Sequence, residues 1–156
     1  LTWHNEHYQY YYGDVYHDNV DIKENNYNYN QFVSVDGDKV IGLIKYNIDR
    51  SIPIVKNLSI INFDKVKKGN NKILFGKDVN KAIKDIFFKY NFKKIEFDVV
   101  IGNPIRETYL KLIKKYNGNI IGVKNDSVKL LDNKLYNKEL YEILKKDIPK
   151  KYFPGR

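Results

Sequence analysis

The hydrophobic residues of this chain change their spacing part-way along the sequence, from every second residue to every third or fourth. Residues 31–35 and 39–48 alternate in the manner of β-strands, and the intervening Asp36-Gly37-Asp38 has the composition of a hairpin turn. A third strand is predicted at residues 54–63, directly after Pro53. These three segments predict an antiparallel β-meander.

Helical spacing begins after the polar stretch 65–72. The apolar positions expected on one side of an amphipathic helix are Val79, Ala82, Ile83, Ile86, Phe87 and Tyr90. We expect Asp78 to cap the first turn of this helix, because its carboxylate can accept a hydrogen bond from a free backbone N–H group. A meander followed by a helix indicates a mixed α/β fold.

The second half of the chain predicts another strand, another helix and a closing set of strands. Residues 94–101 alternate as a strand, and the following residues carry helix-start signals, with Asn103 as the N-cap and Pro104 at the first helical position. The apolar stripe of this helix is Ile105, Tyr109, Leu112, Ile113 and Tyr116, and Gly118 marks its end. The closing strands are expected at residues 119–123, 128–131, 135–136 and 140–144, around an Asp132-Asn133 turn.

Length and composition favour one folded domain across residues 1–156. Hydrophobic residues make up 42% and aromatic residues 15% of the chain, enough to build a core. Residues 1–30 are weakly patterned and, in a sequence without methionine, suggest a truncated N-terminal region, whereas 148–156 form a basic tail. No apolar run approaches twenty residues and no leader is recognisable, so we expect a cytoplasmic protein that does not enter a membrane.

The charge of the chain is uneven. Residues 1–38 hold seven acidic side chains and a single lysine, so the remainder carries about +15 although the whole chain carries +9. A basic body attracts polyphosphates, nucleic acid or an anionic membrane, while scattered lysines that only keep a domain soluble explain it as well. The absence of cysteine excludes disulfides, thiolate zinc sites and cysteine nucleophiles. His4, His7 and His17 with Glu6 are more typical of a polar surface than of a metal site.

Three segments in succession resemble the GNAT family of N-acetyltransferases, in particular its branch that acetylates ribosomal proteins and N-terminal amines. The segments read NLSIINF with FGKDVNKAIKDIFFKY, then KIEFDVVIGNPIRETYLKLIKKY, then GNIIGVKNDSVKLLDNKLYNKELYEIL. The resemblance implies a mixed sheet of six to seven strands flanked by helices, splayed between the central strand and the strand after the first helix. The chain departs from the family in two ways, because only Gly76 matches the glycines of its phosphate loop and because the usual initial strand and two helices are not recognisable.

The resemblance also implies a reaction. It predicts transfer of an acetyl group from acetyl-CoA to a primary amine by direct attack in a ternary complex, without a metal or a covalent intermediate. The acceptor is left open among a protein N-terminus or lysine, a polyamine and an amino sugar, and a homodimer is left open as well. The alternatives are a non-catalytic GNAT-like module that binds nucleic acid or protein, and an enzyme for a longer acyl group.

The residues expected to bind acetyl-CoA lie on the third strand and around the two helix starts. Leu58 and Ile60 would offer backbone N–H groups to the pantetheine arm and the acetyl carbonyl. The diphosphate would lie at the start of the first helix, where backbone N–H groups and the helix dipole favour an anion, near Lys72, Gly76, Lys77 and Asp78. Asn103 would bind the pantetheine or simply cap its own helix.

Tyr109 is the candidate general acid toward the CoA thiolate, because the family places a tyrosine about two turns into this helix. Its position on the apolar stripe is equally consistent with an ordinary core residue. Glu96 and Asp98 share one face of their strand and are candidate bases for the amine, because two neighbouring carboxylates favour proton uptake by one of them. An exposed strand face is the alternative for both residues, and Asp49 is a weaker third candidate.

Overall fold

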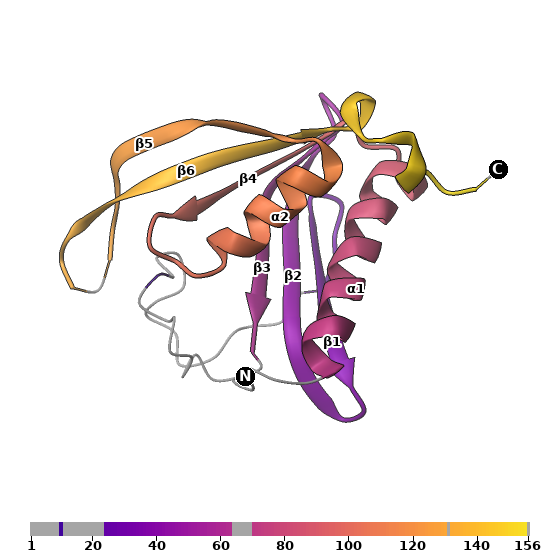
Figure 1. The fold of residues 1–156 in the computed structure, drawn as a ribbon, viewed down its shortest axis with the longest axis horizontal. Helices are drawn as coiled ribbons and strands as arrows, with labels where there is room; N and C mark the ends of the chain where they lie inside the picture. The colour runs from indigo at the N-terminus through magenta and orange to yellow at the C-terminus, as the bar shows by residue number, and fades with distance from the viewer. Residues whose placement is uncertain (1–9, 11–23, 64–69, 131, 156) are drawn as a thin grey trace.

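A computed structural model describes residues 10, 24–63, 70–130 and 132–155 of the chain, with the backbone alone at 70–72. Within these residues the chain forms a six-stranded sheet and two α-helices (Figure 1). In chain order the elements are β1 Tyr29–Asp36, β2 Lys39–Asp49, β3 Ile54–Asn62, α1 Asn70–Lys84, β4 Lys94–Val100, α2 Arg106–Tyr116, β5 Asn119–Lys129 and β6 Leu135–Leu144. Short helical turns follow α1, at Asp85–Lys89, and β6, at Lys145–Asp147 and Lys150–Tyr152.

The strand order is β1-β2-β3-β4-β6-β5, which confirms the predicted meander and the mixed α/β sheet. Strands β1, β2 and β3 are antiparallel neighbours, and β4, β6 and β5 form a second antiparallel group. The two groups meet where β3 runs parallel to β4, and that pairing consists of Ile54 opposite Lys94 and Val55 opposite Ile95. Beyond these two pairs the strands separate, as the resemblance implied.

Both helices pack on one face of the sheet (Figure 1). The face of β4 that they cover carries Ile95, Phe97 and Val99, all at most 4% exposed, as the alternation predicted. The helices also contact each other, because the Tyr116 hydroxyl of α2 donates to Asn80 Oδ1 of α1 at 2.9 Å. No helix among the described residues has the length and apolarity needed to cross a membrane.

Helix α1 begins at Asn70, so the prediction that Asp78 caps it is wrong. The apolar stripe starts a turn earlier than the sequence pattern indicated, because Phe75 is buried one turn before Val79. Phe75 packs so closely on β2 that a Cβ on Gly42 would lie 2.3 Å from its ring. Gly42 is therefore required for the approach of α1 to the sheet at Phe75.

Helix α2 begins at Arg106, two residues after the predicted start at Pro104. Asn103 still organises the start, because its Oδ1 accepts from the Ile105 N–H at 3.0 Å and its carbonyl oxygen accepts from the Arg106 N–H at 3.0 Å. At the other end, Asn117 rather than Gly118 adopts the left-handed conformation, with φ of 54°. Gly118 serves a close approach instead, since a Cβ there would lie 2.6 Å from a β6 carbonyl oxygen.

Candidate active site

Strand β3 contains a bulge shortly after its last pair with β4. Asn57 has φ of 55°, in the left-handed region that asparagine tolerates better than most residues. The register between β2 and β3 shifts at the same point, between the pairs Lys45–Ser59 and Asn47–Lys56. Because a bulge bends its strand and increases the local twist, it accounts for the departure of β3 from β4. We call the region beyond the last β3–β4 pair, where the two strands no longer pair, the slot.

The slot is lined by a backbone donor of β3 and a hydroxyl of α2. The Ile60 N–H donates to the Tyr109 hydroxyl at 3.3 Å. Backbone groups of a strand alternate between its two edges, so the N–H of Leu58 lies on the same edge as that of Ile60. The structure therefore brings Tyr109, the candidate acid, to the β3 edge that carries the Leu58 and Ile60 N–H groups, which the sequence analysis proposed together as donors.

Tyr109 is 4% exposed and belongs to a cluster of three aromatic rings. The Phe97 ring meets it edge-on at 5.0 Å, and the Tyr141 ring meets it edge-on at 6.1 Å. Phe97 and Tyr141 stack at 5.2 Å. The ring of Tyr109 thus lies in the core, as one of the two expectations for this residue stated, while its hydroxyl reaches the β3 edge of the slot.

A buried polar group lies beside this cluster and was missed by the sequence analysis. Glu139 on β6 is 7% exposed and accepts from Arg106 Nε at 2.8 Å and Nη2 at 3.1 Å, and it also accepts from the Tyr141 hydroxyl. The Arg106 hydrogen bonds lower the pKa of Glu139, and burial followed by the contact with Glu139 raises the pKa of Tyr141. A signal was available, because Glu139 shares its strand parity with the buried Tyr141 and Ile143.

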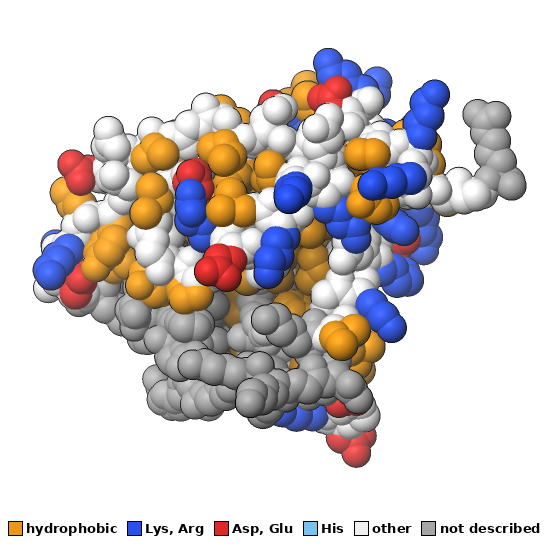
Figure 2. Space-filling view, in the orientation of Figure 1, with side chains coloured by type: hydrophobic (Ala, Val, Ile, Leu, Met, Phe, Trp, Pro, Cys, Tyr) orange, Lys and Arg blue, Asp and Glu red, His pale blue; other side chains and the backbone are white. Residues whose placement is uncertain are grey.

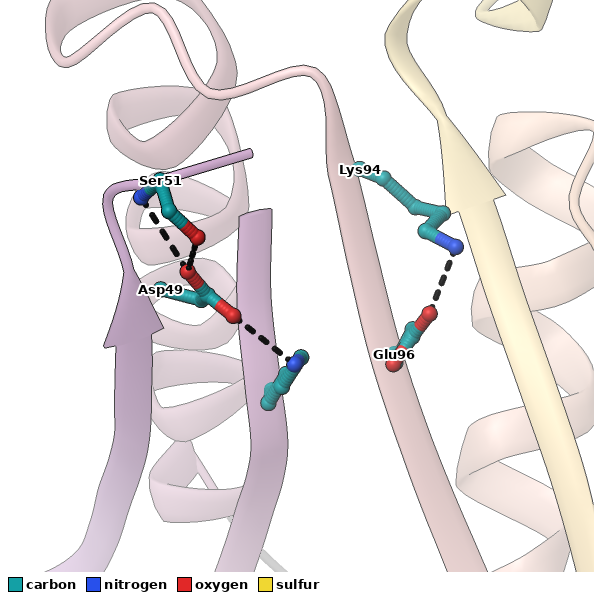
Figure 3. Close-up of polar contacts among 5 residues, drawn as sticks. Asp49, Ser51, Lys94 and Glu96 are labelled. Carbon is teal, nitrogen blue, oxygen red and sulfur yellow. Dashed lines mark hydrogen bonds and ion pairs between the residues drawn. The ribbon is translucent and has the colours of Figure 1, made fainter. Parts of the chain in front are cut away.

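Glu96 and Asp98 point away from the face that α1 and α2 cover, since they alternate with Phe97 on β4. Glu96 Oε1 lies 2.5 Å from Lys94 Nζ (Figure 3), and Asp98 Oδ1 lies 2.9 Å from Lys138 Nζ. The pair of neighbouring carboxylates is therefore matched by a pair of lysines. The structure places both candidates on the strand that borders the slot, on the opposite face from the Tyr109 ring.

The pKa of Asp49 is too low for a general base. Its Oδ1 accepts from Ser51 Oγ at 2.5 Å and Ser51 N at 3.1 Å, and its Oδ2 lies 2.9 Å from Lys56 Nζ (Figure 3). These contacts, with the Ser51 hydroxyl first, lower the pKa of Asp49 to about 2. So weak a base removes few protons from an amine, which argues against the third candidate.

The fold is similar to those of several solved structures. The spermidine N-acetyltransferase SpeG of Vibrio cholerae, in a point-mutant form, matches with a TM-score of 0.63 and 18% identity over 81% of this chain and 70% of that one. A probable acetyltransferase of the GNAT family from Chromobacterium violaceum matches with a TM-score of 0.63 and 11% identity over 78% and 62%. The chain has the GNAT fold. No protein-family description and no curated protein matches its sequence.

In this GNAT fold the start of α1 lies earlier than three of the four predicted phosphate-binding residues, and only Lys72 belongs to its first turn. The first four N–H groups of a helix have no partner within it, and here they belong to residues 70–73, which include Lys72. Gly76, Lys77 and Asp78 lie about two turns inside the helix. A Cβ on Gly76 would meet nothing within 4 Å, so no close approach explains this glycine.

Asp78 has a structural partner, whereas the early histidines and the segment before α1 are not described. Asp78 accepts a hydrogen bond from Ser34 of β1, so its carboxylate faces the meander. Residues 64–69, which precede α1, lie outside the described part of the chain, as do His4, Glu6, His7 and His17. Among the residues that are described, no three His, Asp or Glu side chains gather in a way that could hold a metal ion.

Proposed function

We propose that this protein is an N-acetyltransferase that moves an acetyl group from acetyl-CoA to a primary amine by direct attack in a ternary complex. The observation that supports this best is the slot itself, where the β3 edge carrying the Leu58 and Ile60 N–H groups faces the Tyr109 hydroxyl. Amine acylation requires a donor for the developing oxyanion and an acid for the leaving thiolate. Both kinds of group meet here, on separate elements, at one place.

We assign different roles to the two N–H groups of β3. Ile60 N–H already donates to the Tyr109 hydroxyl, so it would help to orient that hydroxyl as the acid for the CoA thiolate. Leu58 N–H, on the same edge, would polarise the acetyl carbonyl. When bound, acetyl-CoA supplies the thioester, and the amides of its pantetheine arm suit the edge of a strand. Asn103, which precedes α2, would bind the pantetheine arm as well.

The diphosphate of the cosubstrate would be held at the start of α1. The first N–H groups of a helix, here those of residues 70–73, have no partner within it, and together with the helix dipole they favour an anion. Lys72 in the same turn is cationic. Gly76 and Lys77, further along the helix, would contribute less than the sequence suggested. Lys and Arg side chains are spread over the surface around α2 and the C-terminal turns (Figure 2), which favours approach of a polyanion.

Glu96 and Asp98 would remove the proton of the amine, directly or through water, from the β4 face opposite α2. Their lysine partners would have to release them for this role. If the rate of the Glu96→Gln variant decreases at pH values below neutral as the wild-type rate does, Glu96 has no such role. The same comparison applies to Asp98→Asn. The acceptor would be a primary amine, and the match to a spermidine acetyltransferase makes a polyamine the first to try.

The test has two parts, performed on the full chain. Isothermal calorimetry with acetyl-CoA measures binding, and a thiol-release assay measures transfer to spermidine, an N-terminal peptide and an amino sugar. We expect micromolar binding and release with at least one amine. Binding without release from any acceptor would favour a non-catalytic module, and no binding at millimolar acetyl-CoA would refute the proposal. Parallel assays with a longer acyl-CoA identify the acyl group.

A further inference from the structure

The buried Glu139 occupies an unusual place for a carboxylate. It lies in β6 on the face covered by the helices, at 7% exposure, where an uncompensated charge would be strongly destabilising. Three hydrogen bonds compensate it, two from the Arg106 guanidinium and one from the Tyr141 hydroxyl. The Arg106 side chain is 40% exposed, and an ion pair with one exposed partner adds little to stability, so stability alone does not explain the buried carboxylate.

The two partners of Glu139 lead to Tyr109 by separate routes. Arg106 is the first residue of α2 and lies three residues, nearly one turn, before Tyr109, so its paired hydrogen bonds fix the position of that turn against β6. Tyr141 stacks on Phe97, and both rings contact the edge of Tyr109. One route sets where the helix lies, and the other sets how the Tyr109 ring is held.

We propose that Glu139 is a positioning residue that holds the Tyr109 hydroxyl against the Ile60 N–H through Arg106 and Tyr141. A hydroxyl on a buried ring can be moved in only two ways, by shifting its helix or by turning its ring, and Glu139 is bonded to the group that controls each. The Arg106–Glu139 geometry adds direction, because a guanidinium that donates two parallel bonds fixes an angle as well as a distance.

The first test does not depend on catalysis. Tyr109→Phe removes the acceptor of the Ile60 N–H, so the amide resonance of Ile60 in a ¹H–¹⁵N spectrum must shift. Glu139→Gln should move the same resonance in the same direction, while Glu107→Gln, which removes an exposed carboxylate beside Arg106, should leave it in place. An Ile60 resonance that is unchanged in a folded Glu139→Gln protein would overturn the proposal, whatever the protein catalyses.

The second test rests on the proposed function and uses steady-state kinetics. Glu139→Gln should lower kcat about tenfold with less than a roughly twofold change in KM, since a displacement of ~1 Å at a reacting group can cost ~100-fold. In a Tyr109→Phe background the same substitution should cause no further loss of kcat. Independent, multiplicative losses would reject the positioning role while leaving the acetyltransferase proposal intact. A wild-type protein without activity would reject the latter alone.

Two further variants cover the case in which Glu139→Gln does not fold. Tyr141→Phe removes one hydrogen bond from Glu139 and keeps the ring, and Arg106→Lys keeps the charge but not the paired geometry. Each should shift the Ile60 resonance by part of the Tyr109→Phe change, and Tyr141→Phe should do so with the Arg106–Glu139 pair intact. Absence of a shift in both would count against the proposal as directly as the first test.

Discussion

The two ends of the β3–β4 pair differ in how the β3 backbone is satisfied. At one end Ile54 and Val55 pair with Lys94 and Ile95, as in any parallel sheet. At the other end the strands separate and the Ile60 N–H finds its acceptor in a tyrosine side chain instead. An unsatisfied buried N–H costs about 1–3 kcal/mol, so a slot within a sheet needs such substitutes. The comparison shows that a sheet can be opened inside a core when a helix supplies the missing acceptor.

Tyr109→Phe breaks the open end and has the largest expected effect. We expect kcat to fall about 100-fold, because loss of a general acid costs ~10²- to 10⁴-fold. The thiol-release assay at saturating acetyl-CoA measures it. Tyr116→Phe is the matched control, since it also removes a buried hydroxyl from α2, one that donates to Asn80 rather than into the slot. Equal losses of kcat in the two variants would show that Tyr109 acts only through packing.

Ile95→Ala weakens the paired end. Ile95 is fully buried opposite Val55, so the substitution removes core contacts and should lower the free energy of unfolding by about 3 kcal/mol. The kcat of the folded fraction should change little, because no group of the slot is lost. Urea denaturation measures the stability, and Ile101→Ala, at a 38% exposed position, should stay within about 0.5 kcal/mol of the wild type. A large loss of kcat without a loss of stability would contradict the division between the two ends.

Asn57 marks the boundary between the two ends. Asn57→Val places a β-branched residue at φ of 55°, so we expect a loss of about 1–2 kcal/mol in the free energy of unfolding. Asn57→Gly should keep the free energy of unfolding within a few tenths of a kcal/mol of the wild type, because glycine adopts this conformation readily. Thermal and urea unfolding provide both values. A valine variant as stable as the glycine variant would show that the bulge does not depend on the left-handed residue.

Local patterns predicted much of the scaffold around this boundary. Alternation in β4 correctly placed Phe97 in the core, and helical spacing correctly placed Tyr109 and Tyr116 on the buried stripe of α2. Both patterns depend on neighbours in the sequence, which a single chain displays directly. The separation of β3 from β4 was different, because it was implied by the resemblance and not by the residues. A bulge at Asn57 leaves no periodic signal.

The features that the sequence did not reveal depend on partners distant in the chain. The burial of Phe75 in α1 was not predicted, because it depends on a close approach to Gly42, 33 positions earlier in the chain. Glu139 was missed because a lone acidic residue is expected at the surface, although its parity matches the buried positions of β6. The lysine partner of Asp98 comes from another strand, so the alternation of β4 could not show it.

Asp49 offers the smallest and most specific test of the paired end. It lies opposite Ile54 and binds Lys56 of β3, and its pKa is lowered to about 2. A carboxyl group whose pKa is depressed in the folded state contributes stability that is fully present above its unfolded pKa, near 3.8, and is lost as the pH falls toward 2. Urea midpoints of the wild type should therefore exceed those of Asp49→Asn by a constant amount above about pH 5, and the two should converge between about pH 4 and 2. Ser51→Ala removes the leading hydrogen bond and should show part of the same convergence. A difference that persists unchanged to pH 2 would mean that Asp49 acts through its shape, and that the charge contributes nothing to holding the paired end together.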